Sequence, residues 1–308
     1  MIHNQFNKIN NKILYYYDRF NINLKKPNLT LKKKIYRDNN WQVCYENLIS
    51  NGYAKLPFKF KLNDYDNLSS LFEPNFKFDD FYLITKISDI DQFGKSSTCL
   101  SFKSPILKQL FSKELYLLIK NYYGGNFFVR NCPFLRLDIK EKRKIIHDQS
   151  LFHLDHAVRQ LSIIIFIKSI SEQSTHTKFI EKTHLNSWLN LREKDFNRHS
   201  DKFKKIVSSY ENKNTTKSLI GQKGEAYIFD AGNGLHKGFY GNDRGIIHLT
   251  FSKSRRHAYY NSSYETEYRK KASNNFEKYY FGPLDFNKNL LDEYASNFWN
   301  KNTFKYLF

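Results

Sequence analysis

Phe152-His153-Leu154-Asp155-His156 places a histidine and an aspartate two residues apart, and an apolar run over residues 161–167 follows it at once. Residues i and i+2 of an extended strand point to the same face. His153 and Asp155 can therefore reach one metal ion from one side of a strand or strand end. A single His-x-Asp also arises by chance, and the two side chains would then only hydrogen-bond to the backbone.

A second histidine would complete a set of three ligands. His236 is the candidate, since it follows the segment GEAYIFD at residues 224–230. Two histidines and one carboxylate on one face, with the other positions open, are typical of non-haem Fe(II) oxygenases. His248 competes for the same role. We favour His236 because it opens a predicted strand, whereas His248 lies in the middle of one.

The composition indicates a folded chain in a reducing compartment. Of 308 residues, 40% are hydrophobic, with 28 Phe and 22 Tyr, which is enough for a large core. The three cysteines are odd in number and widely spaced, so we expect free thiols and a cytoplasmic protein. The sequence contains no run of 18 apolar residues, so no membrane span is predicted. The N-terminus lacks the apolar core of a signal peptide.

The net charge of +20 raises the question of a nucleic-acid or anionic-membrane partner. The lysines are spread along the chain among many Asn, Ile and Tyr residues, a mixture that AT-rich coding sequence produces without selection for a partner. The densest basic clusters are Lys25-Lys26 and residues 32–34. We therefore expect a small-molecule substrate and do not expect nucleic acid.

The pattern along the chain predicts an α+β fold, mainly β with flanking helices. Residues 1–40 are interpreted as an N-terminal extension with a helix over 9–20, and residues 41–308 as one domain with a C-terminal helical region. Helices are predicted at 41–50, with Val43, Leu48 and Ile49 buried, and from Ser104-Pro105 to a stop at Gly124-Gly125. Short strands are predicted at 53–57, 127–129, 134–139, 161–167, 178–180, 226–229 and 246–251. Many short strands after a helical start favour a β-sandwich or jelly roll.

Several motifs stand in one order along the chain. They are Asn51-Gly52-Tyr53-x-x-Leu56-Pro57, His153-x-Asp155, KFIEKTH at 178–184, GEAYIFD at 224–230 followed by His236, and Gly241-Asn242-Asp243-Arg244. Over roughly residues 41–253 this order resembles the phytanoyl-CoA dioxygenase-like Fe(II)/2-oxoglutarate oxygenases. One departure is Glu181-Lys182, which stands where the family has Pro-Gly.

The resemblance implies a double-stranded β-helix, the jelly-roll core also seen in cupins. It implies that His153, Asp155 and His236 bind Fe(II), and that Arg244 binds the distal carboxylate of 2-oxoglutarate. Arginine suits this role because its planar fork makes two-point carboxylate contacts and stays charged. A hairpin turn is predicted at 241–243, between His236 and Arg244.

Other polar residues are candidates around the cosubstrate. If Arg244 points into the barrel, alternation places His248 and Thr250 on the same face; Thr250 is either a cosubstrate contact or an ordinary interior threonine. Arg136 and Asp138 share a face, which either meets the cosubstrate or substrate or is an outward polar face. Gln149 is a further candidate for the same contact.

The remaining histidines are given structural interpretations. His184 is expected to be a structural turn residue, and His147, His156 and His176 are expected at the surface or in loops. The predicted reaction uses Fe(II), 2-oxoglutarate and O₂, releases succinate and CO₂, and hydroxylates a C–H bond. Desaturation and ring closure are reachable by the same route. The alternatives are a cupin-like metal- or ligand-binding protein without oxygenase turnover and, from charge alone, a nucleic-acid-binding protein.

Overall fold

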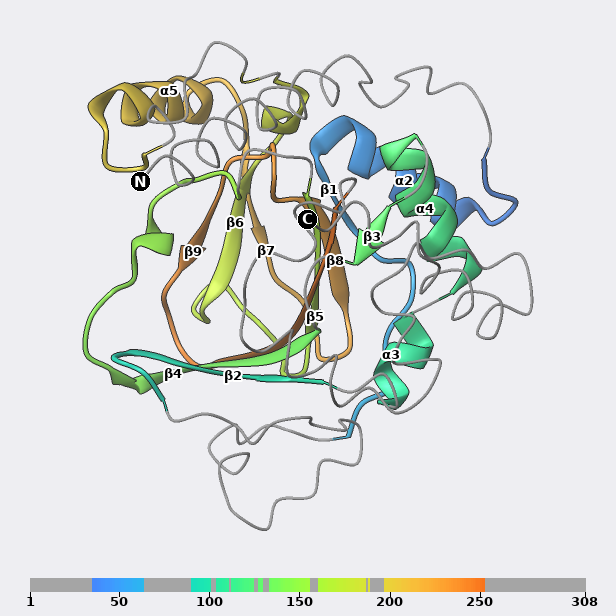
Figure 1. The fold of residues 1–308 in the computed structure, drawn as a ribbon, viewed down its shortest axis with the longest axis horizontal. Helices are drawn as coiled ribbons and strands as arrows, with labels where there is room; N and C mark the ends of the chain where they lie inside the picture. Colours follow the sequence, from blue (N-terminus) through green and yellow to red (C-terminus); the bar gives the residue numbers. More distant parts are fainter. Residues whose placement is uncertain are drawn as a thin grey trace, which may run out of the picture.

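A computed structural model describes residues 35–63, 90–100, 104–110, 112–124, 127–129, 133–155, 160–186, 188 and 197–252 (Figure 1). Two antiparallel sheets make up the core. The large sheet has the order β1-β8-β5-β10-β4-β2, with β3 paired to β10, and the small sheet has the order β7-β6-β9. The predicted α+β fold with a jelly-roll core is confirmed.

The strands are β1 (Tyr53–Lys55), β2 (Phe93–Cys99), β3 (Phe128–Val129), β4 (Phe134–Arg143), β5 (Gln160–Phe166), β6 (His176–Ile180), β7 (Thr216–Leu219), β8 (Ala226–Asp230), β9 (His236–Phe239) and β10 (Arg244–Ser252). The helices are α2 (Asn39–Asn51), α3 (Pro105–Leu110), α4 (Lys113–Tyr123) and α5 (Asp201–Glu211), with short 3₁₀ turns η2 (Asp148–Ser150) and η3 (Thr183–Leu185).

Helix α2 begins and ends as its sequence predicts. The Asp38 side chain accepts a hydrogen bond from Asn40 N at 2.8 Å, and Gly52, at φ 87°, ends the helix in the left-handed conformation that glycine adopts at low cost. Leu48 and Ile49 are buried as predicted. Val43 is 46% exposed, so its predicted burial is wrong; it lies on the face of α2 that points away from the sheet.

The single helix predicted from residue 104 to Gly124-Gly125 is two helices, although the predicted stop at Gly124 is confirmed. Ser112 has an extended backbone, and its side chain accepts from Leu115 N at 3.1 Å, so it caps a new helix, α4. The apolar residues of α3 and α4 still pack in one core, between the helices and the outer face of the large sheet. The spacing therefore predicted the buried face correctly but missed the break.

Strand β5 is buried along its whole length because both of its faces are covered. Leu161, Ile163 and Ile165 pack with the helices on the outer face. The inner face changes along the strand, from polar Gln160 and Ser162 to Ile164 and Phe166. Ile164 and Phe166 pack against residues of both sheets and close one end of the jelly roll. The other end, beside Gln160 and Ser162, is polar and can hold a site.

The hairpin predicted at residues 241–243 is wrong. Strand β9 belongs to the small sheet and β10 to the large one, so this segment carries the chain from one sheet to the other. Residues 80–98 show no readable sequence pattern and were expected to form a loop that lines the pocket, but strand β2 begins within them. Strand β7 and helix α5 were not predicted. The predictions for residues 9–20, His156 and the tail from residue 264 fall outside the described residues. No described helix combines the length and apolar character that crossing a membrane requires.

Candidate metal centre and pocket

Backbone pairing brings His153 and His236 together from distant parts of the sequence. His153 N donates to His236 O at 2.9 Å, and His236 N donates to His153 O at 3.1 Å. Asp155 is held next to them, since its backbone N donates to Ala231 O at 2.8 Å. The His-x-Asp pair thus lies in a loop docked on the edge of β9, ahead of β5, rather than on a regular strand.

The three side chains converge on one point. The Nε2 atoms of His153 and His236 lie 3.7 and 3.8 Å from Asp155 Oδ1, and one potential ligand atom of each residue lies within 4.8 Å of the others. Both histidines are buried, whereas 31% of the Asp155 side chain is exposed. The predicted trio is therefore assembled in space.

Backbone carbonyls fix which nitrogen of each ring faces the centre. His153 Nδ1 lies 2.8 Å from Leu151 O, and His236 Nδ1 lies 3.0 Å from Gly234 O. A carbonyl only accepts, so each Nδ1 carries the proton and each Nε2 presents a lone pair toward Asp155. Burial lowers the pKa of His153, which keeps its ring neutral as metal binding requires.

Gln160 holds the carboxylate of the trio in one orientation. Its Nε2 donates to Asp155 Oδ2 at 3.2 Å, which leaves Oδ1 turned toward the two histidines. Gln160 is 3% exposed and opens β5. No sequence pattern indicates this contact, because two residues five positions apart have no fixed relative placement outside a regular helix or strand.

This donor set fits a divalent metal such as Fe(II). It consists of two neutral imidazole nitrogens and one carboxylate oxygen on one side of a pocket of about 90 Å³. The pocket walls include Ser162, Tyr240 and His248. His248 lies outside the trio, and its ring packs edge-on against Phe134 with centroids 4.9 Å apart. Of the two competing histidines, it is His236 that the fold brings to His153.

The other end of the pocket is charged. Strand register aligns Lys95 on β2, Asp138 on β4 and Arg244 on β10 in one row across the large sheet. Arg244 Nε and Nη2 both donate to Asp138 Oδ2, at 2.9 and 2.7 Å. Arg136 Nη2 lies 3.4 Å from Asp138 Oδ1. Burial alone would raise the pKa of Asp138, but the charges of Arg136 and Arg244 outweigh it and lower the pKa to about 2.

The residues predicted near the cosubstrate lie at different depths. Arg136, Gln149 and Arg244 line the pocket. Asp138 is fully buried, so the alternative that it lies on an outward polar face is wrong. Its carboxylate makes the two-point contact with Arg244 that was expected from the cosubstrate. Thr250 is 1% exposed and is not among the pocket-lining residues.

Two residues at the charged end, Lys95 and Tyr240, were not predicted from the sequence. Lys95 Nζ donates to Gln149 Oε1 at 3.1 Å and to the Tyr240 hydroxyl at 2.9 Å. Burial, then repulsion by Arg136, lowers the pKa of Lys95 to about 7. Lys95 was not predicted because residues 80–98 were expected to form a loop, whereas Lys95 lies on strand β2. Tyr240, four residues after His236 at the end of β9, could have been found from that spacing.

The turn after β6 has a residue with positive φ at the second of the two positions where the phytanoyl-CoA dioxygenase-like pattern has Pro-Gly. Lys182 has φ 64°, a left-handed conformation that glycine adopts more easily. His184 is a structural turn residue as predicted, with Nε2 2.9 Å from Ile49 O. His176 was expected at the surface but is 1% exposed within β6, where its Nδ1 lies 2.7 Å from Ser174 O. His147 caps the 3₁₀ turn η2 by accepting from Gln149 N.

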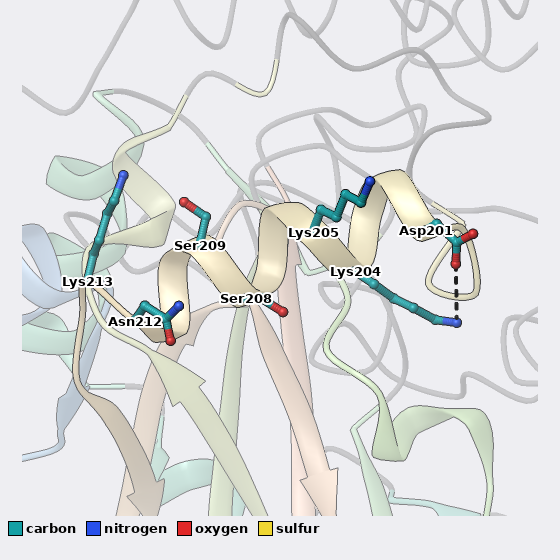
Figure 2. Close-up of a pocket in the computed structure, with 7 residues that line it drawn as sticks. All are labelled: Asp201, Lys204, Lys205, Ser208, Ser209, Asn212 and Lys213. Atoms are coloured by element: carbon teal, nitrogen blue, oxygen red, sulfur yellow. Dashed lines mark ion pairs between the residues drawn. The ribbon is translucent and has the colours of Figure 1, made fainter.

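A second hollow, of about 630 Å³, lies against α5. Figure 2 shows its lining side chains, which run from Asp201 to Lys213 along one helix surface and just past its end. Lys204 Nζ pairs with Asp201 Oδ1 at 3.9 Å, and such an exposed pair contributes little to stability. The described lining contains no histidine or cysteine. We therefore assign the candidate site to the pocket beside His153 and His236.

No protein-family model matches the chain, and no curated protein matches its sequence. Similar solved structures include EvdMO1, with TM-score 0.40 and 12% identity, covering 69% of this chain and 50% of that one. The epimerase SnoN in complex with Fe³⁺, alpha ketoglutarate and nogalamycin RO has TM-score 0.44 and 10% identity, covering 70% and 84%. EctD from S. alaskensis with bound Fe has TM-score 0.43 and 14% identity, covering 72% and 80%. The chain thus spans about half the length of EvdMO1.

Proposed function

We propose that the chain is a non-haem Fe(II)- and 2-oxoglutarate-dependent oxygenase, similar to the phytanoyl-CoA dioxygenase-like family, that hydroxylates a C–H bond of a small molecule. The observation that carries the proposal is the convergence of His153, Asp155 and His236 beside a pocket. Two histidines and one carboxylate on one face leave open positions for a cosubstrate and O₂.

In this proposal each residue of the trio has a defined task. His153 and His236 bind Fe(II) through Nε2, because their Nδ1 atoms are already bonded to backbone carbonyls. Asp155 binds it through Oδ1, because Gln160 holds Oδ2. When bound, iron with O₂ supplies the oxidative decarboxylation of 2-oxoglutarate to succinate and CO₂, coupled to oxidation of the substrate.

The remaining pocket residues bind the cosubstrate and keep water from the trio. Arg244 attracts the distal carboxylate of 2-oxoglutarate with the part of its guanidinium that Asp138 does not use. Ile164, Phe229 and Ile246 supply apolar wall near the trio and keep water out. Asp155 fills the position that halogenating relatives leave to chloride, so we expect hydroxylated and not chlorinated product.

Anaerobic titration tests this proposal. Fe(II) is added to the metal-free chain, then 2-oxoglutarate, and the visible absorption is recorded after each addition. The proposal requires a charge-transfer band that needs both additions, and succinate release once O₂ is admitted. Absence of the band in a chain that binds Fe(II) would contradict it.

A cupin-like metal- or ligand-binding protein without turnover is the second candidate. One observation favours it: Asp138 already makes a two-point contact with Arg244, so the expected cosubstrate anchor is partly occupied. This candidate requires Fe(II) binding with no new band after 2-oxoglutarate and no succinate. The same titration therefore separates the two functions.

We also propose that residues 41–308 form a single domain with a C-terminal helical region, preceded by the extension 1–40. Not all of the extension lies outside the core, because Tyr36 is 4% exposed and stacks on Trp41 with ring centroids 6.2 Å apart. A truncation should therefore remove residues 1–34 and keep residue 35 onward. Such a form should retain the thermal stability of the full chain, and a large loss would show that the removed residues belong to the domain.

A further inference from the structure

The polar network at the charged end of the pocket centres on Lys95. Its ammonium donates to Gln149 Oε1 and to the Tyr240 hydroxyl oxygen. Arg136 Nη2 also points to Gln149 Oε1, at 3.3 Å. Gln149, Tyr240 and Arg136 all line the pocket, whereas Lys95 is not among its lining residues. Lys95 and Arg136 thus engage the acceptor oxygens of Gln149 and Tyr240.

What remains available to the pocket is a set of donors. The Gln149 amide nitrogen makes no hydrogen bond within the described part of the chain, and neither do Arg136 Nε and Nη1. Burial raises the pKa of the Tyr240 hydroxyl, so it keeps its proton. A site that offers only donors is matched by a ligand that only accepts, and a carboxylate or phosphate group is such a ligand.

The charges around Asp138 also indicate an anionic ligand. Arg136, Arg244 and Lys95 surround Asp138. The two arginines alone outnumber the one carboxylate, and Lys95 adds a further positive charge whenever it is protonated. Asp91, in the exposed turn before β2, also attracts Lys95, but from outside the pocket lining. Burial, then repulsion by Arg136, lowers the pKa of Lys95 to about 7, so an anion bound beside it would favour its protonated form. The distal carboxylate of 2-oxoglutarate, next to Arg244, neutralises one of these positive charges.

We propose that Arg136, Gln149 and Tyr240, with Lys95 behind them, form a second anion subsite that binds an acid group of the substrate. The group is an oxyanion, either a carboxylate or a phosphate ester. Its assignment to the substrate rests on the proposed function, whereas the donor cluster itself does not. The subsite narrows the substrate class to anionic small molecules and gives Arg136 a role separate from that of Arg244.

Calorimetric titration of the full chain, loaded anaerobically with Fe(II) and 2-oxoglutarate, tests the subsite. The probes are acetate and inorganic phosphate, and acetamide is the neutral counterpart of acetate. We expect one or both anions to bind, acetamide not to bind, and Arg136→Gln to weaken anion binding roughly ten- to a hundredfold. Comparing the two anions identifies the acid group. Lys140→Gln, an exposed change four residues along β4, is the matched control and should leave binding unchanged.

The visible band of the loaded chain is recorded in parallel and shows that the probe has not displaced the cosubstrate. Equal anion binding by the native and Arg136→Gln forms would overturn the subsite, as would equal binding of acetamide or no anion binding to the native form. If Arg136→Gln weakens the binding of 2-oxoglutarate as much as it weakens the binding of the probes, the cluster binds the cosubstrate and the inference is wrong. If the native chain gives no band, the proposed function fails. Phosphate titration of the metal-free native and Arg136→Gln forms then judges the donor cluster separately.

Discussion

At the metal end of the pocket, backbone carbonyls hold the side chains of His153 and His236, whereas at the charged end Asp138 and Arg244 hold each other. The carbonyls that fix the histidines belong to Leu151 and Gly234, each two residues earlier in the chain. The charged pair joins β4 and β10, more than a hundred residues apart. The orientation of the two histidine rings therefore depends on local backbone, whereas the charged end depends on the register of the large sheet. The backbone pairing that brings His153 to His236 is itself long-range.

The largest effect should come from removing the carboxylate of the charged end. Asp138→Ala leaves Arg244, which is 5% exposed, without its partner. Breaking a buried pair in this way costs about 3–5 kcal/mol. Urea unfolding of native and variant chains measures the loss. Glu141→Ala, exposed on the same strand, should stay within about 0.5 kcal/mol of native. A loss below about 1 kcal/mol in Asp138→Ala would show that this pair does not hold the charged end.

The charged end should also make stability depend on pH. The pKa of Asp138 falls from 3.8 to about 2 on folding, so the ionised form stabilises the fold above pH 4. This contribution, of about 2 kcal/mol, should disappear as the pH falls from 4 toward 2. The measurement is the difference in unfolding free energy between native and Asp138→Asn across this range, which cancels the other titrating groups. A difference that does not change with pH would contradict the assigned pKa.

Arg244 links the charged end to the cosubstrate. Arg244→Ala should raise the 2-oxoglutarate concentration for half-maximal succinate release roughly ten- to a hundredfold, the value of a charged hydrogen bond. Arg244→Lys keeps the charge but loses the planar fork, so it should lie between native and Ala. Iron affinity should change little, because Arg244 is not in the trio. An unchanged half-saturation point in the Ala form would remove Arg244 from the cosubstrate site.

Gln160 supports the metal end directly, through its hydrogen bond to Asp155. Gln160→Met keeps the length but removes the donor to Asp155 Oδ2, so the carboxylate loses its fixed orientation. Losing such a partner costs roughly ten- to a hundredfold in metal affinity. Anaerobic Fe(II) titration measures the change, with Gln109→Met, the same substitution at an exposed position of α3, as the control. Native affinity in Gln160→Met would mean that Asp155 keeps its orientation without Gln160.

The two ends also differ in how much of them the sequence could predict. His153, Asp155 and His236 could be identified because their spacing and flanking strands are local features. The pairing of Asp138 with Arg244, and the arrival of Lys95 beside them, depend on the register of β2, β4 and β10, which no local pattern specifies. The hairpin prediction failed for a related reason: a turn sequence does not tell whether the next strand joins the same sheet.

Iron binding by matched histidine variants tests the central claim most directly. Native, His236→Ala and His248→Ala chains are dialysed anaerobically against Fe(II), and bound iron per chain is measured after far-UV circular dichroism confirms the fold. Both histidines line the same pocket, but only His236 lies in the trio with His153 and Asp155. We expect one iron bound by the native and His248→Ala chains and none by His236→Ala. Iron retained by His236→Ala and lost from His248→Ala would contradict the assignment.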